Sequence, residues 1–396
     1  MFKNLEFVKL KVIYWGKYID LYLIELFNHL ESEIGESIDY VLVNERNFAR
    51  KIQSNKLINP TKNRITLLRN KGFFKNAKEI IKDNNEAVHI FLSIWGEKRF
   101  IFIILYALFL KRKVMVIQEP YSESPYGYWA DETCILSYIK IILRKLAYPF
   151  SKILFRAVSR GKLPCILAVS ELAENQLVKA NFLEETIFPF GYFISGRNIT
   201  YDQYTKNSEI KLIFSGSLIK RKGLDIVIKA LSIINTKETK IVLDIYGQCD
   251  IDNIINQKTK GIQYKGTYRQ DDAQRTIAQY DILILPSHHD GWGLVVNEAL
   301  LQNVPVIVSD RAGAKILVEH SGAGRVFEHE NVQQLVDIFT EIFDNPTILS
   351  KMKDSCRIIR DIITPYNGAL YMKKVMDYYF FNEGVRPEPF WMKKQI

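Results

Sequence analysis

Cysteine is scarce in this sequence of 396 residues, and its spacing argues against two classes of protein. The four cysteines, Cys134, Cys165, Cys249 and Cys356, include no Cys-x-x-Cys pair. Neither a disulfide scaffold nor a zinc site is therefore expected, and a reducing compartment is favoured. Clusters of Asp and Glu with metal-ligand spacing are also absent. The longest uncharged apolar run, Phe100 to Leu110, is too short to span a bilayer, so we expect a buried helix there.

The overall composition is that of a globular protein of two ordinary domains. Hydrophobic residues make up 47% and charged residues 25% of the chain, which excludes a disordered chain. The first residues, Met-Phe-Lys-Asn-Leu-Glu, do not have the charged-then-apolar layout of a signal peptide. We therefore expect a cytoplasmic protein, with the inner face of the cell membrane as a further expected location.

The net charge of +10 is concentrated in the first half of the chain. Residues 1–190 carry 28 Lys and Arg against 20 Asp and Glu, whereas the remainder carries 26 against 24. Residues 137–162 mix basic with apolar side chains, which predicts an amphipathic basic helix. Three interpretations stay open: an anionic membrane or lipid-linked substrate, a nucleic acid, and a solvated surface. No nucleic-acid motif supports the second of them, and no nucleic-acid partner is expected.

Strand-like apolar runs alternate with helical patterns from end to end, which predicts an α/β chain with two doubly wound parallel sheets. The longest helix is expected from about Cys134 to Gly161, and a last helix from about Asn367 to Phe381. The predicted strands are Lys9–Tyr14, Tyr40–Val43, Arg64–Leu68, Ala87–Ile94, Val114–Gln118, Cys165–Val169 and Thr186–Phe190, then Lys211–Ser215, Ile241–Tyr246, Ile262–Lys265, Asp281–Pro286, Val304–Ser309 and Gly324–Phe327.

A polar, turn-rich stretch marks the boundary between the two predicted domains. We assign residues 1–193 to an N-terminal domain and 194–208 to a linker. Residues 209–366 form the C-terminal domain, and 367–396 are expected to return as a crossover helix and tail that pack on the first domain. In such sheets ligands bind beyond the carboxyl ends of the strands. Two domains that face each other would therefore form a cleft, and each domain could hold one of two reactants.

The most informative segment lies where the apolar run ending at Pro286 passes into a helix that opens near Gly293. Two carboxylates, Asp290 and Glu298, flank this turn, with Gly291 and Gly293 between them. Glycines permit close approach of another molecule to the backbone, and the N-terminus of a helix favours a phosphate. The carboxylates can accept hydrogen bonds from hydroxyl groups on either side of that phosphate. The pattern therefore indicates a sugar nucleotide site.

Four blocks in the second half, in order, carry a family resemblance. They are Phe214–Asp225 with its Lys-Arg-Lys-Gly turn, Leu243–Gly247, Asp281–Leu300, and Asn303–Asp310 followed by Gly313. From about Lys211 to Phe343 the sequence resembles the family 4 (group 1) retaining glycosyltransferases of the GT-B fold, of the bacterial surface-polysaccharide type. The resemblance implies two Rossmann-like domains that face a cleft.

The resemblance also implies roles for individual residues. Lys222, with Arg221 assisting, would bind the diphosphate of the donor, where it would offset charge that grows on the leaving group. Glu298 would accept hydrogen bonds from the ribose, and Asp290 would contact the transferred sugar. Asp290, Lys222 and Glu298 are therefore the expected catalytic residues.

Backbone N–H groups complete the expected donor site. Gly291, Trp292 and Gly293, followed by Leu294 and Val295 at the helix start, would present them to the sugar hydroxyls and the phosphates. Trp292 stands where the family usually has Phe and is expected to pack under the loop. His288 and His289 are expected to be loop residues, and base contacts are expected near Tyr246–Gly247 and Gly266–Tyr268.

The sequence departs from the family pattern at several positions. The first carboxylate is Asp290 where the family has Glu, and Ser217 stands where many members have an Arg on the diphosphate. The segment Gln118–Pro125 contains no His, although members often have one in the corresponding loop, so Glu119, Tyr121 or Glu123 are alternatives for the acceptor side. In Trp15–Tyr18 only Gly16 remains of a Gly-rich loop, and it is expected to let the donor phosphates approach the backbone.

The implied activity is transfer of a hexose from a UDP-sugar or GDP-sugar to a hydroxyl of a lipid-linked glycan, with retention of the anomeric configuration. Capsule or lipopolysaccharide synthesis is the expected setting, without cofactor or obligatory metal. An anionic membrane surface is a further expected partner. The main alternative is a non-catalytic GT-B partner subunit that binds sugar nucleotide or glycan. A GT-B sugar nucleotide epimerase is less favoured, because those enzymes generally lack the Asp290–Glu298 arrangement.

Overall fold

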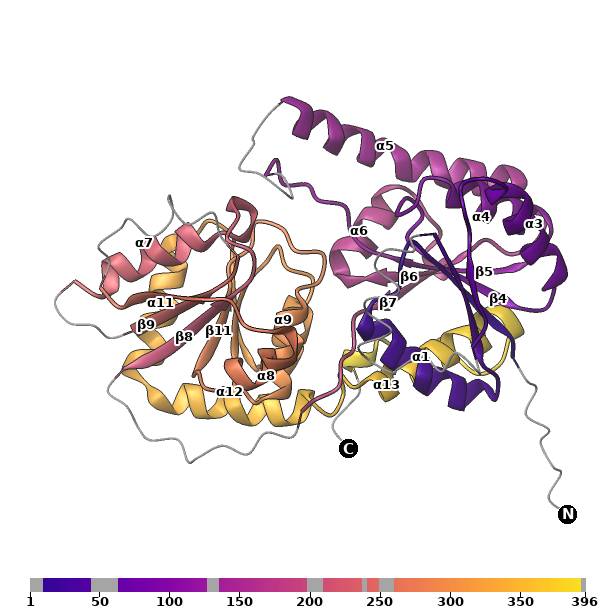
Figure 1. Cartoon of the computed structure of the whole chain (residues 1–396). Coiled ribbons are helices and arrows are strands. Elements are labelled where there is room, and N and C mark those ends of the chain that lie inside the picture. Colours follow the sequence, from indigo (N-terminus) through magenta and orange to yellow (C-terminus); the bar gives the residue numbers. More distant parts are fainter. Residues whose placement is uncertain are drawn as a thin grey trace, which may run out of the picture. The chain divides into compact units, whose positions relative to one another are not determined.

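The computed structural model describes residues 10–43, 63–126, 135–197, 209–236, 241–248 and 260–392. The chain divides into two compact units, each with its own parallel sheet (Figure 1). The first unit comprises Met1–Pro120, Leu143–Phe193 and Pro365–Ile396, and the second comprises Tyr121–Ile142 and Ile194–Thr364. The part of the predicted linker at 198–208 lies outside the described residues.

The segment Tyr121–Ile142 departs from the predicted division, which kept residues 1–193 together. It belongs to the second unit, and the contacts of Tyr126 give the reason. The Tyr126 ring lies 4.6 Å from the His288 ring, and the ammonium of Lys220 lies 4.8 Å from the centre of the same ring. Ring contacts and cation–π attraction of this kind hold the segment on the second unit.

The first unit contains a sheet of seven parallel strands in the order β3-β2-β1-β4-β5-β6-β7. Helices α3, α4 and α5 lie on one face of it, and α1 and α13 on the other (Figure 1). The strands are β1 (Val12–Gly16), β2 (Ile38–Leu42), β3 (Ile65–Leu67), β4 (Val88–Leu92), β5 (Lys113–Gln118), β6 (Cys165–Val169) and β7 (Ile187–Phe190). The helices are α1 (Leu21–Ile34), α3 (Phe73–Asp83), α4 (Phe100–Phe109), α5 (Ile135–Val158, which belongs to this unit from Leu143 onward), α6 (Ser170–Lys179) and α13 (Pro365–Met376).

The last part of the chain packs against the first unit. Helix α13 lies along α1, with the rings of Tyr366 and His29 5.8 Å apart. A π-helical turn, Asp377–Phe381, follows α13. The Lys162 ammonium donates to the Tyr379 carbonyl over 2.6 Å, and the Arg386 guanidinium donates to backbone carbonyls that include that of Ile187. Residues from 365 onward therefore complete the first unit.

Helix α4 is only partly buried. The apolar run at Phe100–Leu110 predicted a buried helix, yet the side chains of Phe102 and Phe109 are 59% and 43% exposed. The remaining turns contribute Phe100, Ile103 and Ile104 to the core. Phe102 and Phe109 are two turns apart and share the outer side of the helix. Uniform hydrophobicity therefore did not mean uniform burial, and this prediction was wrong for the outer side.

The second unit contains six parallel strands in the order β10-β9-β8-β11-β12-β13. The strands are β8 (Ile210–Ser215), β9 (Ile241–Tyr246), β10 (Ile262–Gly266), β11 (Ile282–Leu285), β12 (Val306–Ser309) and β13 (Gly324–Phe327). The helices are α7 (Leu224–Ile234), α8 (Ala273–Ile277), α9 (Leu294–Leu301), α10 (Lys315–Ser321), α11 (Val332–Asp344) and α12 (Pro346–Ile359). This strand order is that of doubly wound nucleotide-binding sheets, with its reversal between β8 and β11.

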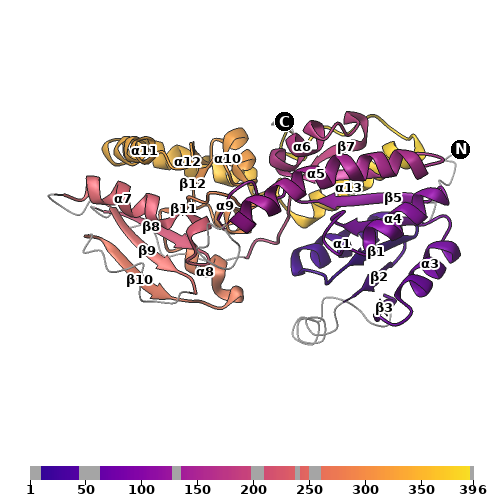
Figure 2. The same cartoon turned by 90° about the horizontal axis from the view of Figure 1, so that it is seen from above.

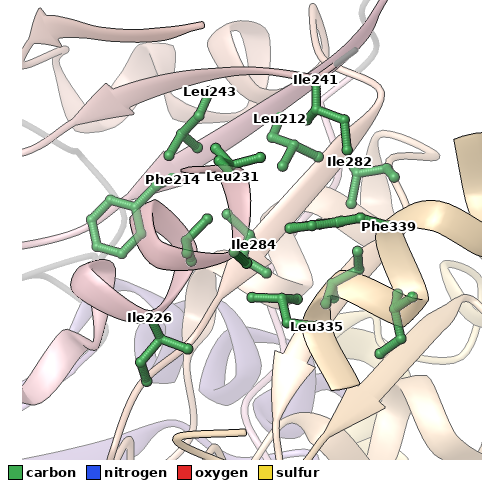
Figure 3. Close-up of a cluster of buried hydrophobic side chains, with 14 of the residues drawn as sticks. Leu212, Phe214, Ile226, Leu231, Ile241, Leu243, Ile282, Ile284, Leu335 and Phe339 are labelled. Atoms are coloured by element: carbon green, nitrogen blue, oxygen red, sulfur yellow. The ribbon is translucent and has the colours of Figure 1, made fainter. Parts of the chain in front are cut away.

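The core of the second unit fills the space between the sheet and the helices α7 and α11 (Figure 3). Leu212 and Phe214 from β8 and Ile284 from β11 are completely buried there, together with Leu231 of α7 and Leu335 of α11. Because strands of a parallel sheet are covered on both faces, their sequences are continuous apolar runs, as in the Ile-Leu-Ile-Leu of β11. The carboxyl ends of β8 and β11 are thereby held rigidly side by side.

Candidate functional site

The candidate site lies in the second unit, at the carboxyl ends of β8 and β11. These strands are neighbours, with Leu212 opposite Ile282, and the helix that follows each of them lies on a different face of the sheet. At such a switch point the loops after the two strands diverge and leave room for a ligand. The loop after β8 carries Arg221 and Lys222, and the loop after β11 carries Asp290.

The turn after β8 is shaped by a glycine that touches the neighbouring loop. Lys220–Lys222 form a single 3-10 turn, and Gly223 follows with a φ of 67°. A Cβ atom on Gly223 would stand 2.1 Å from the carbonyl oxygen of Pro286. Only glycine fits a left-handed conformation at that distance. The Lys-Gly pair therefore brings Lys222 against the end of β11.

Two further contacts join the loops. The His288 N–H donates to the Arg221 carbonyl over 2.9 Å, and the Arg221 guanidinium donates to the His289 carbonyl over 2.5 Å. The His288 ring packs against Tyr126 at a tilted angle, and burial lowers the pKa of its imidazole. The contacts of His288 and Arg221 therefore hold the loops after β8 and β11 together. His288 lies in the loop between β11 and α9, where the sequence predicted loop residues.

Lys222 and Asp290 form a direct ion pair. The lysine Nζ lies 2.5 Å from Asp290 Oδ2, and both side chains are 16% exposed. Burial pushes the pKa of the Asp290 carboxyl upward, but Lys222, helped by Arg221, outweighs it and holds the pKa below its ordinary value. Asp290 is therefore ionised at neutral pH and oriented by the lysine.

The backbone around Asp290 is fixed from the other side. Its N–H donates to the Arg311 carbonyl over 3.0 Å, and its carbonyl accepts from the Gly313 N–H over 3.0 Å. The Trp292 carbonyl in turn accepts from the Ala314 N–H. The loop that follows β12 thus supports the loop that contains Asp290. These backbone hydrogen bonds fix the position of the aspartate relative to the sheet.

Helix α9 begins at the site and directs its N-terminus into it. Gly293 has a φ of 97°, and a Cβ there would stand 2.7 Å from a methyl carbon of Leu285. The Trp292 indole is buried and donates to Asn297 Oδ1 over 2.8 Å, which ties the turn to the helix. The first N–H groups of a helix, here those of Leu294 and Val295, have no partner within it. Gly291 precedes this start and is partly exposed.

Glu298 occupies the next turn of α9 and carries a perturbed carboxyl. Burial raises its pKa to about 7, although Arg197 opposes the rise. In the residues that the structure describes, its carboxylate makes no hydrogen bond and no ion pair. A half-buried carboxylate without a protein donor can accept hydrogen bonds from a ligand, and groups with a perturbed pKa are candidates for functional sites.

One tyrosine lies close to Glu298, and a second tyrosine packs against the first. The hydroxyl of Tyr268 is hydrogen-bonded to Ser215 Oγ, and burial, with the nearby charge of Glu298, raises its pKa to about 12. The Tyr246 ring lies 5.2 Å from that of Tyr268. A Cβ on Gly247 would overlap the Gly216 carbonyl, so glycine is required there. These residues line the region where the sequence predicted contacts to a base.

The first unit has a cavity at the corresponding switch point, between β1 and β4. The cavity measures about 200 Å³, and its walls come from the loops after β1, β4, β5 and β7. The lining residues are Lys17, Tyr18, Asp20, Tyr22, Leu92, Ser93, Gly96, Glu119 and Tyr192. The Tyr192 hydroxyl donates to the Glu119 carboxylate. Polar hydrogen-bonding groups at this place suit a hydroxyl-rich ligand.

Gly16 lies beside this cavity in sequence, but local packing already explains it. A Cβ there would stand 2.5 Å from the Tyr14 hydroxyl and 2.6 Å from the Tyr18 carbonyl. Its predicted contact with a phosphate stays a prediction. His89 is the histidine in β4, and it is buried and satisfied, because the Trp15 indole donates to it and it contacts the Asn84 carbonyl.

The structure brings most predicted residues of the second unit together. Arg221, Lys222, Asp290 and the start of α9 form one cluster, and Glu298 lies one turn beyond. Sequence reasoning missed two residues, Arg197 and Tyr126, and placed Tyr268 only within a stretch expected to contact the base. The turn-rich composition around Arg197 indicated only a linker, and no motif pointed to Tyr126. Ser217 is exposed in the turn after β8.

The described residues contain neither a candidate metal site nor a candidate membrane span. No three His, Cys, Asp or Glu side chains among them gather into a possible metal site. No helix in the described part of the chain is long and apolar enough to cross a bilayer.

Comparison with known proteins points to one family for the second unit. Residues 199–358 match the family model described as glycosyl transferases group 1. An uncharacterized glycosyltransferase of Haemophilus influenzae is 28% identical over 174 residues, which cover 41% of this chain and 49% of that protein. The capsular polysaccharide biosynthesis glycosyltransferase CapM of Staphylococcus aureus is 22% identical over 201 residues, 46% of this chain and 53% of that protein. The matches thus span about half the length of these relatives.

The fold of the whole chain resembles that of solved glycosyltransferases. Anabaena Alr3699/HepE in complex with UDP superposes with a TM-score of 0.66 at 12% identity, over 93% of this chain and 100% of that one. An identity this low shows the fold alone. Residues 199–358 are therefore similar to the group 1 glycosyl transferases, and the chain as a whole has the GT-B fold.

Proposed function

We propose that this protein transfers a hexose from a nucleoside diphosphate sugar to a hydroxyl of a lipid-linked surface glycan and retains the anomeric configuration. The observation that carries the proposal is the cluster at the ends of β8 and β11, where Lys222, Arg221 and the start of α9 surround one space. Two cations and a helix N-terminus suit a diphosphate.

The donor would lie across this cluster. Its diphosphate would contact Lys222 and the N–H groups of Leu294 and Val295, and its ribose hydroxyls would donate to Glu298. The base would lie near Tyr246 and Tyr268. Ribose hydroxyls are the donors that the Glu298 carboxylate lacks, because it makes no hydrogen bond within the described residues.

The Lys222–Asp290 pair would let the lysine change its partner when the donor binds. Without donor, the lysine charge is balanced by Asp290 over 2.5 Å. A bound diphosphate would share the ammonium, and Asp290 would then be released toward the hydroxyls of the transferred sugar. The aspartate keeps its charge throughout because its pKa is held low.

Catalysis would consist mainly of positioning and charge stabilisation. The bond from the anomeric carbon to the diphosphate oxygen breaks, the acceptor oxygen bonds to the same face of that carbon, and the acceptor proton passes to the departing diphosphate. Lys222, Arg221 and the helix N–H groups would stabilise the charge that grows on the leaving group. No step in this proposal requires a metal.

The acceptor would bind to the first unit, in the cavity that contains Asp20, Glu119 and Tyr192. Hydroxyl groups of a glycan match its carboxylates and phenols. Relatives of the second unit include a capsular polysaccharide glycosyltransferase, which supports a surface polysaccharide as the setting. We propose a cytoplasmic site of action at the inner membrane face, where lipid-linked glycans would be extended.

A ligand screen tests the donor side. We expect at least one member of a panel of UDP-sugars and GDP-sugars to raise the melting temperature, and the Glu298→Ala variant to lose that stabilisation. Donor hydrolysis or glycan transfer with the same sugar nucleotide should follow, and the Lys222→Ala variant should abolish it.

The same screen separates catalysis from a binding-only role. Stabilisation by a sugar nucleotide with neither hydrolysis nor transfer to any glycan would favour a non-catalytic partner subunit. No stabilisation by any nucleoside diphosphate sugar would contradict both.

A further inference from the structure

From Leu143 onward, helix α5 belongs to the first unit and is anchored to it by one side only. Tyr148 and Phe155 are buried on that side. The Gln118 amide donates to the Tyr148 hydroxyl over 2.7 Å, and the Trp95 indole donates to Ser151 Oγ over 3.0 Å. Positions 148, 151 and 155 lie on one face of a helix. That face accounts for the packing of α5.

The opposite face of α5 is also apolar, and it is exposed. Six large side chains there are between 44% and 62% exposed: Ile139, Ile142, Leu143, Leu146, Phe150 and Ile153. Their spacings of three, one, three, four and three residues place all of them within one stripe of the helix. Figure 2 looks onto α5 from the side that faces away from the sheet of the first unit. A contiguous apolar stripe of this kind marks an interaction surface.

The charges of α5 are all of one sign. The helix contains five basic residues and no acidic one: Lys140, Arg144, Lys145, Lys152 and Arg156. Lys140, Lys145 and Arg156 are exposed and make no ion pair within the described residues. The basic positions flank the apolar stripe on both sides of the helix.

The length of α5 suits a helix that lies in the plane of a surface. Its 24 residues extend over about 36 Å, and it is too polar to be a candidate for crossing a membrane. At its end, the Arg160 guanidinium lies 4.3 Å from the centre of the Phe109 ring. Phe109 is one of the exposed aromatic residues of α4, so apolar surface continues beyond the helix.

We propose that α5 docks this protein on a bilayer that contains anionic phospholipids. The stripe would enter the boundary between head groups and acyl chains, and the flanking lysines and arginines would contact the anionic head groups. A second copy of the chain fits the surface less well, because pairing two α5 helices would bring their basic flanks together. The inference deepens the proposed function, since it places the enzyme where a lipid-linked acceptor is found. Its evidence does not depend on donor chemistry.

Flotation of the full-length chain with lipid vesicles tests the proposal without donor or acceptor. The protein should float with vesicles of phosphatidylcholine and phosphatidylglycerol at low salt, and less with phosphatidylcholine alone. The triple variant Leu143→Gln, Leu146→Gln, Ile153→Gln should bind on the order of a hundredfold more weakly, because it removes three inserted side chains. The triple variant Lys140→Gln, Lys145→Gln, Arg156→Gln should lose a similar factor only with the anionic vesicles.

A matched control removes exposed apolar side chains elsewhere. Ile233 and Ile358 are 50% and 46% exposed on α7 and α12 of the second unit. The variant Ile233→Gln, Ile358→Gln should float like the unaltered protein. Equal flotation of the stripe variant and this control would overturn the proposal, as would failure of the unaltered protein to float at low salt. A dimer in solution that the stripe variant abolishes would assign the stripe to a second copy.

Donor binding keeps this proposal separable from the proposed function. The stripe variant should retain the thermal stabilisation by a sugar nucleotide and the transfer to a soluble glycan, and lose only transfer to acceptors in vesicles. Flotation without any donor binding would refute the proposed function and leave the role of α5 standing.

Discussion

At the scale of single residues, the pairing of Lys222 with Asp290 links stability to function. The two groups lie in contact and are mostly shielded from water. A buried pair of this kind contributes little when intact, because desolvation offsets the attraction, but removing one partner exposes the full cost of the other. The pair stabilises the fold above the ordinary pKa of aspartate. That contribution is lost as the pH falls through the lowered pKa of Asp290.

We predict that Lys222→Ala lowers the free energy of unfolding by roughly 2 kcal/mol, because it strands the Asp290 carboxylate. The double variant Lys222→Ala, Asp290→Asn should recover most of that loss, yet transfer should stay reduced by about a hundredfold or more. Denaturant unfolding and transfer assays on both variants measure the two effects. A double variant no more stable than Lys222→Ala would show that Lys222 does not stabilise the fold through its contact with Asp290.

For Glu298, burial outweighs the attraction to Arg197 and raises the pKa of the carboxyl to about 7. In the unfolded chain the group has an ordinary carboxyl pKa, so the folded state binds its proton more tightly. The unliganded fold is therefore most favoured at low pH. It loses stability as the pH rises from the unfolded value to about 7, where the deficit becomes complete.

We predict that Glu298→Gln raises the free energy of unfolding by roughly 2 kcal/mol at about pH 8, and changes it little at pH values below the unfolded pKa. The same variant should lose donor binding, because an amide cannot replace a carboxylate that accepts two hydroxyl hydrogen bonds. Thermal unfolding against pH, with and without donor, measures both. An unaltered pH profile of stability would mean that Glu298 does not carry the shifted pKa.

The residues of the site were predictable where a short motif carries them. The pattern of one segment indicated Asp290, Gly293 and Glu298, and the family resemblance of another segment implied a role for Lys222. The contact between Lys222 and Asp290 depends on two loops 68 residues apart that meet only in the folded sheet. Arg197 and Tyr268 approach Glu298 in the same way, and no local signal in the sequence identifies such contacts.

At the scale of elements, the turn after β8 depends on Gly223. Its φ of 67° and its contact with the Pro286 carbonyl act together. Gly322 offers a comparison, because it has a φ of 72° at the end of α10 but only an ordinary contact at 3.5 Å with Ser355.

We predict that Gly223→Ala lowers the free energy of unfolding by roughly 3 kcal/mol or more, since strain and a backbone clash add. Gly322→Ala should cost about 1 kcal/mol, which is the cost of the left-handed conformation alone. Denaturant titration of both variants checks the difference. Equal losses would show that the loops after β8 and β11 are not in close contact.

The strands were largely predictable, whereas the exposure of helices was not. Buried parallel strands such as β6 and β11 are short apolar runs, and their residues identify them at once. Helices α4 and α5 contain apolar side chains on both sides, and composition cannot tell which side the protein covers. Phe102 and Leu146 are therefore exposed, although hydrophobicity alone would have buried them.

At the scale of the whole molecule, two sheets of similar topology hold the two proposed substrates. Each has a switch point at the carboxyl ends of its strands, one with the cations and Glu298, the other with the cavity around Glu119. The alternation of elements predicted both sheets. The grouping of Tyr121–Ile142 with the second unit was not predictable, because it rests on the contacts of Tyr126 with distant residues.

We predict that Glu119→Gln reduces glycan transfer by about tenfold to a hundredfold, because the charge offered to acceptor hydroxyls is removed. Donor binding and slow donor hydrolysis should stay unchanged, since both belong to the second unit. Glutamine can still accept from the Tyr192 hydroxyl, so the cavity should keep its shape. A loss of donor binding in this variant would contradict the assignment of the acceptor to the first unit.

A crystal structure of the protein with a hydrolysis-resistant sugar nucleotide tests the central claim most directly. We predict that the diphosphate lies within hydrogen-bonding distance of Lys222 Nζ and the first N–H groups of α9, with both ribose hydroxyls on Glu298. A nucleotide bound at any other place, or a Glu298 carboxylate without contact to the ribose, would contradict the account.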